Sequence, residues 1–433
     1  MKEIHIAPLT VEGKFHLGRV MEVVTADVYT RWQLAIQPST ANNMAFVHDS
    51  WNTYISERRS LTLEQREGLI NSYKKSKERL NVLPSQDLRV ENGVLTTQSE
   101  QEFRDDDPFN VECINSALEI LKEKKVVITG IVEGEKGLYL DIDKILELSP
   151  IRETLAETLI FPDSFGNRFN KALDVTNTSS YLGRIPITKR RINGLPVIPA
   201  LLEDVSYHID ERFSRTKESR DLPEPSSKVC VAPLIILSLL PYLRSQKSST
   251  KREIDFISNG VGSSIRFNLV SILLNVSLGI EQPYKNIYLF NRLDLKGFPR
   301  DRDVVDKVES HKLRYLIFDQ MSTNHKVIKD AFANIDPKDE ILNLREFDIF
   351  RKKLDYLKQM ISYESEHTLL PFAPDDKKYL HSLGTLSLMS SLDFSKAFKK
   401  LKEELFRRSK QITQGKNAND IVLVRALELF LPN

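Results

Sequence analysis

The first thirty residues constrain the fold most, because they read as a strand, a glycine-containing loop and a helix. Polar and apolar residues alternate before Pro8, which is typical of a short strand, and from Leu17 to Trp32 apolar residues recur at helical spacing. The loop between them carries His16 and Gly18. Such a loop directs backbone N–H groups and the positive end of a helix dipole at one point. The stretch therefore predicts a site for an anion, typically a nucleotide phosphate, with His16 beside it.

A second unit of the same kind follows in the other half of the chain. Residues 254–258 read as a strand, 259–262 as a glycine-rich loop, 264–278 as an apolar helix and 286–290 as another strand. Two strand–helix–strand halves predict an α/β fold with a Rossmann-like, doubly wound parallel sheet. In such a sheet the ligand lies beyond the carboxyl ends of the strands.

Composition limits the remaining possibilities. The 62 basic and 60 acidic side chains give a net charge of +2, which argues neither for nor against nucleic acid. Cys113 and Cys230 are the only cysteines, so we expect a reducing compartment, no disulfide framework and no cysteine-based zinc site. The longest apolar run, 229–243, is too short for a membrane span and contains two prolines. The N-terminus lacks a signal-peptide pattern. We expect a soluble, cytoplasmic protein without a membrane partner.

Composition shifts divide the 433 residues into segments. A polar stretch ends in Asp-Asp-Asp-Pro near residue 107, and 126–142 reads as a strand hairpin. From Val308 onward the chain reads as helical, with an amphipathic stripe from Phe394 to Phe406 and Ser391 and Asp393 as cap candidates. The predicted domains are 1–107 and 228–306, the two halves of the nucleotide-binding domain, 108–227, a strand-rich insertion, and 307–433, a helical bundle.

The run His16-Leu17-Gly18-Arg19, with Pro8 before it and Ala-Asp-Val after it, resembles the opening of class I aminoacyl-tRNA synthetases, especially the methionyl type. The later segments follow in the same order as in that family. The insertion therefore resembles the family's connective module, and the helical bundle resembles its anticodon-binding domain. The resemblance implies that His16 and Arg19 stabilise the phosphate while a carboxylate attacks ATP, bound with Mg2+, and that Pro8 and Gly18 contact the nucleotide. Arg19 stands where the family has a second histidine, and its guanidinium can also bind phosphate.

The amino-acid site follows from a second match. Asp49 and Thr53 keep their places in the family's Asp-x-His-Gly-Thr, whereas Trp51 and Asn52 replace His-Gly and Asn268 replaces a later histidine. The resemblance implies that Asp49 binds the ammonium group of an amino acid. It also implies that Asp49, Trp51, Asn52 and Asn268 contact the substrate. The alternatives are that Asp49 is a solvated loop acid or helix cap, and that Trp51 and Asn52 merely pack the loop.

The nucleotide site follows from two further segments. Asn259 and Gly260 stand in the family's Gly-Lys-Asp loop and are expected to contact ATP. Lys296 matches the first lysine of Lys-Met-Ser-Lys-Ser, and a proline replaces the second. Arg300 and Arg302 lie close enough in sequence to supply cationic charge to the phosphates, Arg300 as a catalytic residue. The alternative is that this loop has lost its catalytic role and its basic residues are solvated.

Three functions fit these patterns. The first is an ATP-dependent ligase that makes an aminoacyl adenylate and passes the acyl group to a small-molecule amine or hydroxyl, as methionyl-like relatives do in natural-product pathways, some forming nitrogen–nitrogen bonds with a separate cupin partner enzyme. The second is true aminoacylation of tRNA, which is disfavoured because both tryptophans, Trp32 and Trp51, lie in the first domain and none is available to stack on an anticodon. The third is a non-catalytic interaction protein. For the first function we expect a small or polar amino acid rather than methionine.

Overall fold

The structure, a computed structural model, describes most of the chain. The described residues are 1–11, 15–36, 44–54, 61–91, 94–132, 135–148, 151–162, 184–190, 194–196, 229–231, 238–247, 252–290, 308–320, 345–363, 371–411 and 418–432.

A seven-stranded sheet forms the centre of the molecule. Its strands, in spatial order, are β10 (Leu159–Phe161), β16 (Tyr284–Phe290), β15 (Glu253–Gly260), β1 (Lys2–Ile6), β3 (Met44–Val47), β5 (Gln86–Glu91) and β6 (Val94–Glu100). The first five are parallel, and β5 and β6 extend the β3 edge as antiparallel strands. The prediction of a mixed α/β fold with a parallel sheet is confirmed.

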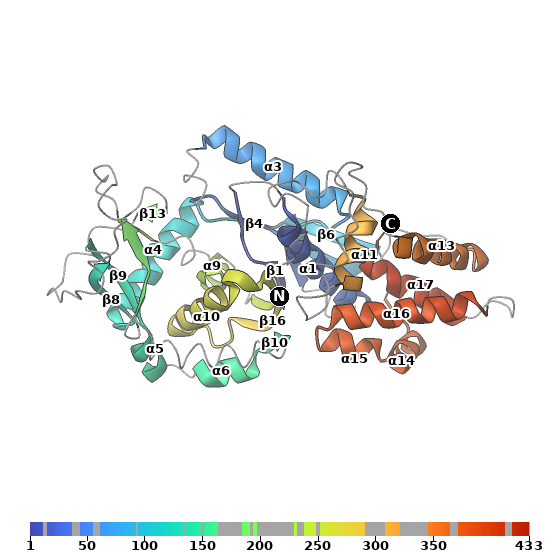
Figure 1. The fold of residues 1–433 in the computed structure, drawn as a ribbon. Coiled ribbons are helices and arrows are strands. Elements are labelled where there is room, and N and C mark those ends of the chain that lie inside the picture. Colours follow the sequence, from blue (N-terminus) through green and yellow to red (C-terminus); the bar gives the residue numbers. More distant parts are fainter. Residues whose placement is uncertain are drawn as a thin grey trace.

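The sheet changes winding direction between β1 and β15. Helix α1 (Leu17–Ile36) leads from β1 to β3, whereas α10 (Val261–Ser277) leads from β15 to β16 on the other side. Right-handed crossovers in opposite directions place their helices on opposite faces, and Figure 1 shows α1 and α10 on opposite sides of β1 and β16. Each face has its own apolar core, one containing the residues of α1 and the other those of α10. A ligand crevice is therefore expected where β1 and β15 end.

The loop predicted at 259–262 is absent, since β15 continues to Gly260 and α10 begins at Val261. The first turn of α10 contains glycine and small residues that show no apolar periodicity. The apolar spacing therefore predicted a helix that begins only at Ser264. The strand-to-helix junction is consequently sharp.

A second, three-stranded parallel sheet lies beyond the carboxyl ends of β1 and β3. Its order is β2 (Leu9–Thr10), β4 (Asp49–Asn52) and β7 (Glu102–Arg104). Strand β2 follows β1 after two residues, and β4 follows β3 after His48 alone. Helix α3 (Leu63–Arg79) runs along this region and begins with a capping box of Thr62 and Gln65. The small sheet thereby places β4 at the crevice.

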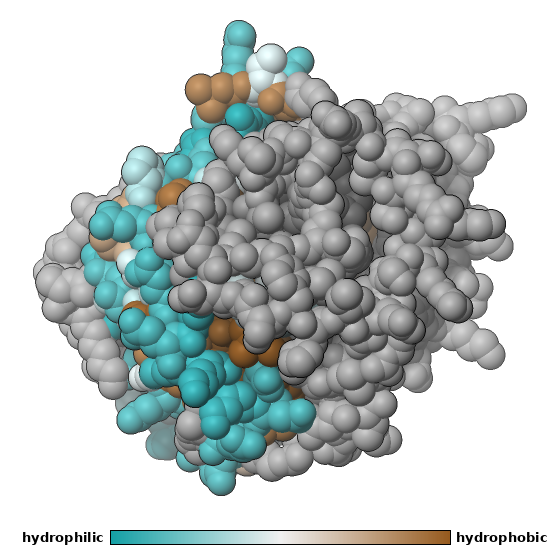
Figure 2. Space-filling model, turned by 90° about the vertical axis from the view of Figure 1, so that its left-hand side faces the viewer, coloured by the Kyte–Doolittle hydropathy of each residue, from teal (hydrophilic) through white to brown (hydrophobic). Residues whose placement is uncertain are grey.

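The segment between the two halves of the sheet contributes to both. The predicted hairpin is present as β8 (Val127–Val132) and β9 (Glu135–Asp141). Strand β10, from the span predicted to be an insertion, instead pairs with β16 in the central sheet. Its three residues gave no strand pattern in the sequence. The other elements here are α4 (Pro108–Glu123), α5 (Ile142–Leu148), α6 (Ile151–Glu157), β11 (Arg184–Pro186), β12 (Thr188–Arg190), β13 (Leu195–Pro196), β14 (Val229–Val231) and α9 (Leu240–Lys247). Figure 2 views this end, where hydrophilic residues predominate among the described ones.

The described residues after 308 form helices only. They are α11 (Ser310–Gln320), α13 (Arg345–Met360), α14 (Pro374–Ser382), α15 (Thr385–Ser390), α16 (Phe394–Ser409) and α17 (Ala418–Phe430). Asp393 caps α16, as predicted. The buried Arg314 ties these helices to α1, because its guanidinium lies 2.5 Å from Asp27 and donates to Phe430 O at 2.7 Å. No helix among the described residues is both long and apolar enough to cross a membrane.

Candidate active site

The crevice expected from the fold would lie above the junction of β1 and β15. Ile6 lies opposite Ser258, and the amide of Ala7 donates to Ser258 O at 3.1 Å. Pro8 is buried immediately after this junction. Asn259 and Gly260 form the last residues of β15. The backbone of these predicted nucleotide-binding residues therefore lies at one sheet edge, where a doubly wound fold binds its ligand.

The start of α1 is built around His16. Its carbonyl accepts from Arg19 N at 2.9 Å and from Val20 N at 3.2 Å, so the helix begins directly after it. The first turn has no acidic residue to neutralise the positive end of the helix dipole. His16 is exposed. The N-terminus of a twenty-residue helix, with an accessible imidazole beside it, fits a phosphate group.

Gly18 is required by the position of the His16 ring. A Cβ atom at residue 18 would lie 3.1 Å from His16 Cε1 and 3.2 Å from His16 Nδ1. Both distances are shorter than those of ordinary van der Waals contacts, so a side chain here would move the imidazole by a few tenths of an ångström. The two motif residues therefore act as one unit: the glycine permits the ring position.

Arg19 turns away from its neighbour and is anchored on α3. The side chain is buried, Nη1 donates to the hydroxyl of Tyr73, and the guanidinium carbon lies 4.9 Å from the centre of that ring. Phe15 packs on the same ring at 5.5 Å. The structure thus connects the start of α1 to α3 through Tyr73. The phosphate-binding role of Arg19 stays a prediction.

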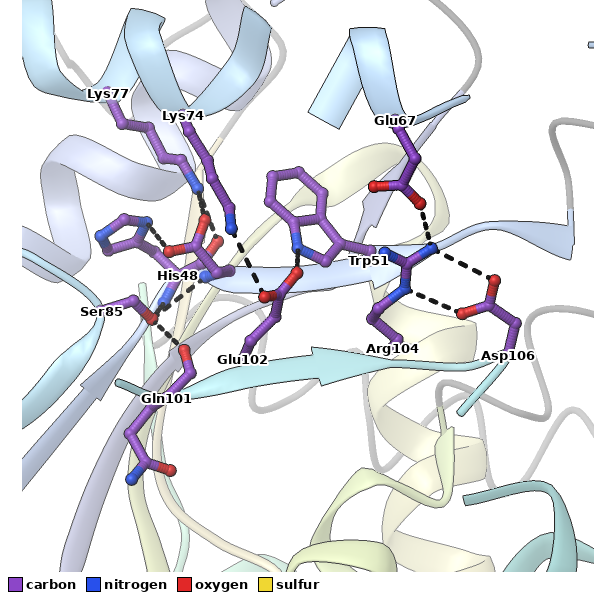
Figure 3. Close-up of polar contacts among 11 residues, drawn as sticks. His48, Trp51, Glu67, Lys74, Lys77, Ser85, Gln101, Glu102, Arg104 and Asp106 are labelled. Atoms are coloured by element: carbon purple, nitrogen blue, oxygen red, sulfur yellow. Dashed lines mark hydrogen bonds and ion pairs between the residues drawn. The ribbon is translucent and has the colours of Figure 1, made fainter. Parts of the chain in front are cut away.

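Asp49 is paired with an internal cation. The ammonium of Lys77 on α3 binds Asp49 Oδ1, lies 3.3 Å from His48 O, and stands 4.5 Å from the centre of the Trp51 ring. Figure 3 shows Lys77 and Lys74 reaching from α3 toward the strand that carries Trp51. Only 2 % of the Lys77 side chain and 9 % of the Asp49 side chain are exposed. The carboxylate predicted to bind a substrate ammonium already has an ammonium partner.

The charges of this cluster follow from burial. Burial lowers the pKa of Lys77 to about 8, against the opposing effect of Asp49, so the lysine is still mainly cationic at neutral pH. Burial is the largest single effect and would raise the pKa of Asp49, but the charge and hydrogen bond of Lys77, with smaller contributions from His48 and Lys74, together hold that pKa below its usual value. Burial and Lys77 lower the pKa of His48 to about 3, so its ring is neutral. Asp49 and Lys77 therefore form a buried ion pair.

Trp51 is fixed from two sides. Its Nε1 donates to Glu102 Oε1 at 2.9 Å, and Lys74 binds the other oxygen of Glu102 at 3.4 Å (Figure 3). The indole is fully buried and lies 6.0 Å from the Tyr73 ring. Packing of this kind agrees with the alternative interpretation, in which Trp51 stabilises the small sheet. Contact between Trp51 and a substrate stays a prediction.

Comparison with known proteins places the fold. No protein-family model matches the sequence, and no curated protein does. Among solved structures, methionyl-tRNA synthetase of Mycobacterium tuberculosis bound by methionyl-adenylate superposes with a TM-score of 0.60 at 12 % identity, covering 99 % of this chain and 88 % of the other. A second structure of that enzyme with methionyl-adenylate gives 0.58 at 13 % identity, covering 99 % and 89 %. This chain has a class I synthetase-like fold.

In this synthetase-like fold Asp105 is buried, which the sequence did not predict. Asp105, fully buried after β7, accepts from Thr53 N at 2.8 Å, Thr53 Oγ1 at 2.5 Å and Tyr54 N at 3.4 Å. Burial raises the pKa of Asp105 to about 6. No described residue forms an ion pair with it. The triple-aspartate run predicted only a charged break, because its sequence does not show which of the three carboxylates turns inward.

Three buried polar side chains on β4 and α10 lack hydrogen-bond partners among the described residues. Ser50 Oγ and both amide atoms of Asn52 and Asn268 find no hydrogen bond within the described part of the chain, and all three residues are 0 % exposed. Leaving such a group unsatisfied costs about 1–3 kcal/mol. The sequence identified Asn52 and Asn268 from the resemblance, but missed Ser50, since a serine in a short strand carries no pattern.

The structure does not describe the remaining residues that were predicted to bind phosphate. Lys296, Arg300 and Arg302 lie outside the described residues. Among the described residues no group of three His, Cys, Asp or Glu side chains could hold a metal ion. Of the other predicted residues, Pro8, Asn259 and Gly260 lie where β1 and β15 end, His16, Gly18 and Arg19 lie at the start of α1, and Asp49, Trp51 and Asn52 lie on β4.

Proposed function

We propose that this protein forms an acyl adenylate from ATP and an amino acid. The observation that carries the proposal is the exposed His16, which lies over Gly18 at the start of α1, whose first turn has no acidic residue, on the strand-end side of the sheet where its winding reverses. Support also comes from the two structures of the same fold that hold methionyl-adenylate. A phosphate at this point meets backbone N–H groups, the helix dipole and an imidazole at once.

In the proposed reaction a carboxylate oxygen of the amino acid attacks the α-phosphorus of ATP, and pyrophosphate leaves. His16 donates a hydrogen bond to the phosphate oxygens as negative charge accumulates on them. Gly18 keeps the imidazole in place, and Arg19 holds the start of α1 against α3 through its contact with Tyr73. Mg2+ bound with ATP neutralises phosphate charge. Lys296, Arg300 and Arg302 are proposed to face the departing pyrophosphate.

We propose a small-molecule amine or hydroxyl as the acceptor of the acyl group. In support, both tryptophans lie before residue 52, so the C-terminal helices contain none to stack on an unpaired base. A separate partner enzyme that uses the product, such as a cupin, is part of the same proposal. Aminoacylation of tRNA is the alternative, because the likeness of fold extends over 99 % of this chain.

The test is pyrophosphate release from ATP with each of the twenty amino acids, with and without tRNA. We expect release with at least one amino acid in the absence of tRNA, and no transfer of that amino acid to tRNA. Amino acid-dependent release that ends in stable aminoacyl-tRNA would favour the alternative. No release with any amino acid, while the protein is folded and binds ATP, would contradict the proposed function.

A further inference from the structure

Helix α1 is buried along most of its length, and its position depends on its polar contacts. The apolar residues of α1 belong to a core that also contains residues of the C-terminal helices. Apolar burial is non-directional, whereas a hydrogen bond defines both a distance and a direction. The polar contacts between α1 and other elements therefore set where the helix lies along its own axis. A dense set of them surrounds Asp27.

Asp27 lies in the middle of α1 and is fully buried. Its Oδ2 accepts from Arg314 Nη2 at 2.5 Å and from Arg31 Nε at 2.9 Å, and its Oδ1 accepts from Leu83 N at 2.9 Å. Arg31 also donates to Asn81 O at 2.8 Å. One carboxylate thus joins α1 to α11 and to the turn that follows α3.

Arg314 brings the C-terminal helices to this junction. It lies on α11, which Figure 1 shows beside α1, and its side chain is fully buried. The two nitrogens that do not face Asp27 donate to Leu80 O at 3.1 Å and to Phe430 O at 2.7 Å. Burial lowers the pKa of Arg314 to about 10, against the opposing effect of Asp27, so the group is cationic at neutral pH. The guanidinium therefore holds the ends of α3 and α17 against the middle of α1.

The junction and the candidate active site share the same two helices. Helix α1 is one uninterrupted helix of 20 residues that begins directly after His16. Near its start, Arg19 binds Tyr73 of α3. About two turns further along α1, Arg314 binds both Asp27 and the residue that ends α3, Leu80. Because a helix moves as a rigid element, a shift at Asp27 also moves the first turn.

We infer that Arg314 is a positioning residue for adenylation: by holding Asp27 it fixes α1 along its axis and keeps the His16 ring at the strand ends. A displacement of about 1 Å, caused far from the reacting atoms, can cost about a hundredfold in rate. The helical bundle is then a support of the active site rather than a separate binding module. The inference rests on the proposed function for the effect on rate, whereas the placement of α1 can be measured without it.

The first experiment compares hydrogen exchange of residues 15–20 in the wild type, Arg314→Met and Arg408→Met. In this segment the amides of Arg19 and Val20 donate to His16 O. Arg408→Met is the matched control, because Arg408 makes a two-point ion pair with Asp420, at 2.6 and 2.9 Å, that joins α16 to α17. Both variants should lower the Tm. Arg314→Met should speed exchange of residues 15–20 about tenfold, and Arg408→Met should leave it unchanged.

The second experiment measures ATP–pyrophosphate exchange in the same variants, with and without His16→Ala. Arg314→Met should lower the rate about tenfold or more when His16 is present, and less than about twofold when it is absent, because the imidazole that it positions is then missing. Arg408→Met should leave the rate unchanged. If Arg314→Met does not fold, Arg314→Lys replaces it, since lysine keeps the charge beside Asp27 but lacks the planar fork that reaches three partners.

Three results would overturn the inference: unchanged hydrogen exchange at the start of α1 in the Arg314 variant, an equal change in Arg408→Met, or an equal loss of rate with and without His16. A wild type that exchanges no pyrophosphate, with faster hydrogen exchange at the start of α1 in the Arg314 variant alone, would count against the proposed function. The placement of α1 by Arg314 would then still hold.

Discussion

Breaking the ion pair between Asp49 and Lys77 should cost more than breaking any exposed pair. In the variant Lys77→Met the side chain keeps its length but loses the ammonium, so Asp49 stays buried without the cation that binds it. Removing one member of a buried pair typically costs about 3–5 kcal/mol. The lost contact with the Trp51 ring adds about 0.5–2 kcal/mol. We expect the free energy of unfolding to fall by about 5 kcal/mol.

A double-mutant cycle separates the pair from its surroundings. Asp49→Asn alone leaves Lys77 buried without a counter-charge, and the double variant Asp49→Asn with Lys77→Met has no charge left to desolvate. The double variant should therefore be more stable than the sum of the single losses predicts, by about 2 kcal/mol or more. Urea unfolding followed by tryptophan fluorescence measures all three, since Trp51 reports on this site directly. Additive losses, or a loss below about 1 kcal/mol for Lys77→Met, would refute the assignment of a buried ion pair.

Two further predictions concern single residues. For Asp105 the pKa in the folded protein is about 6 against an ordinary 3.8, so protonation favours folding: this stabilisation is complete below about pH 4 and is lost as the pH rises through 6. The free energy of unfolding of the wild type, relative to Asp105→Asn, should therefore fall by about 2 kcal/mol between pH 4 and 7, and a difference that does not vary with pH would contradict this. Gly18→Ala should shift the His16 ring and lower the rate of adenylation about tenfold. The Tm should stay equal or rise, because alanine is favoured over glycine in a helix. An unchanged rate of adenylation would show that the position of the ring is unimportant.

The sequence predicted the central architecture because its signals are local. The helix at Leu17, the hairpin within 126–142 and the cap at Asp393 each depend on a few neighbouring residues, and each is present. Strand β10 was missed because three residues are too few to show a period of two. The junction at Gly260 was predicted as a loop because glycine and asparagine favour turns, but sheet pairing with β16 overrides that preference.

The candidate site was predictable only in part. The motif around His16 could be found because its chemistry and spacing lie within four residues. The partner of Asp49 could not, since Lys77 stands 28 positions away and its helix reads as an ordinary charged surface helix. Long-range pairing also decides that Asp105 turns inward while Asp106 binds Arg104 on a more exposed face. Only the folded arrangement shows which acid is paired internally.

The central claim, adenylation at the start of α1, is tested most directly by ATP–pyrophosphate exchange in the wild type and in His16→Ala. The control is His381→Ala, an exposed histidine on α14 in the C-terminal helices. With an amino acid that binds, the wild type and the control should exchange label at equal rates, and His16→Ala should be slower by about a hundredfold with an unchanged Tm. Exchange at the wild-type rate in His16→Ala would contradict the claim.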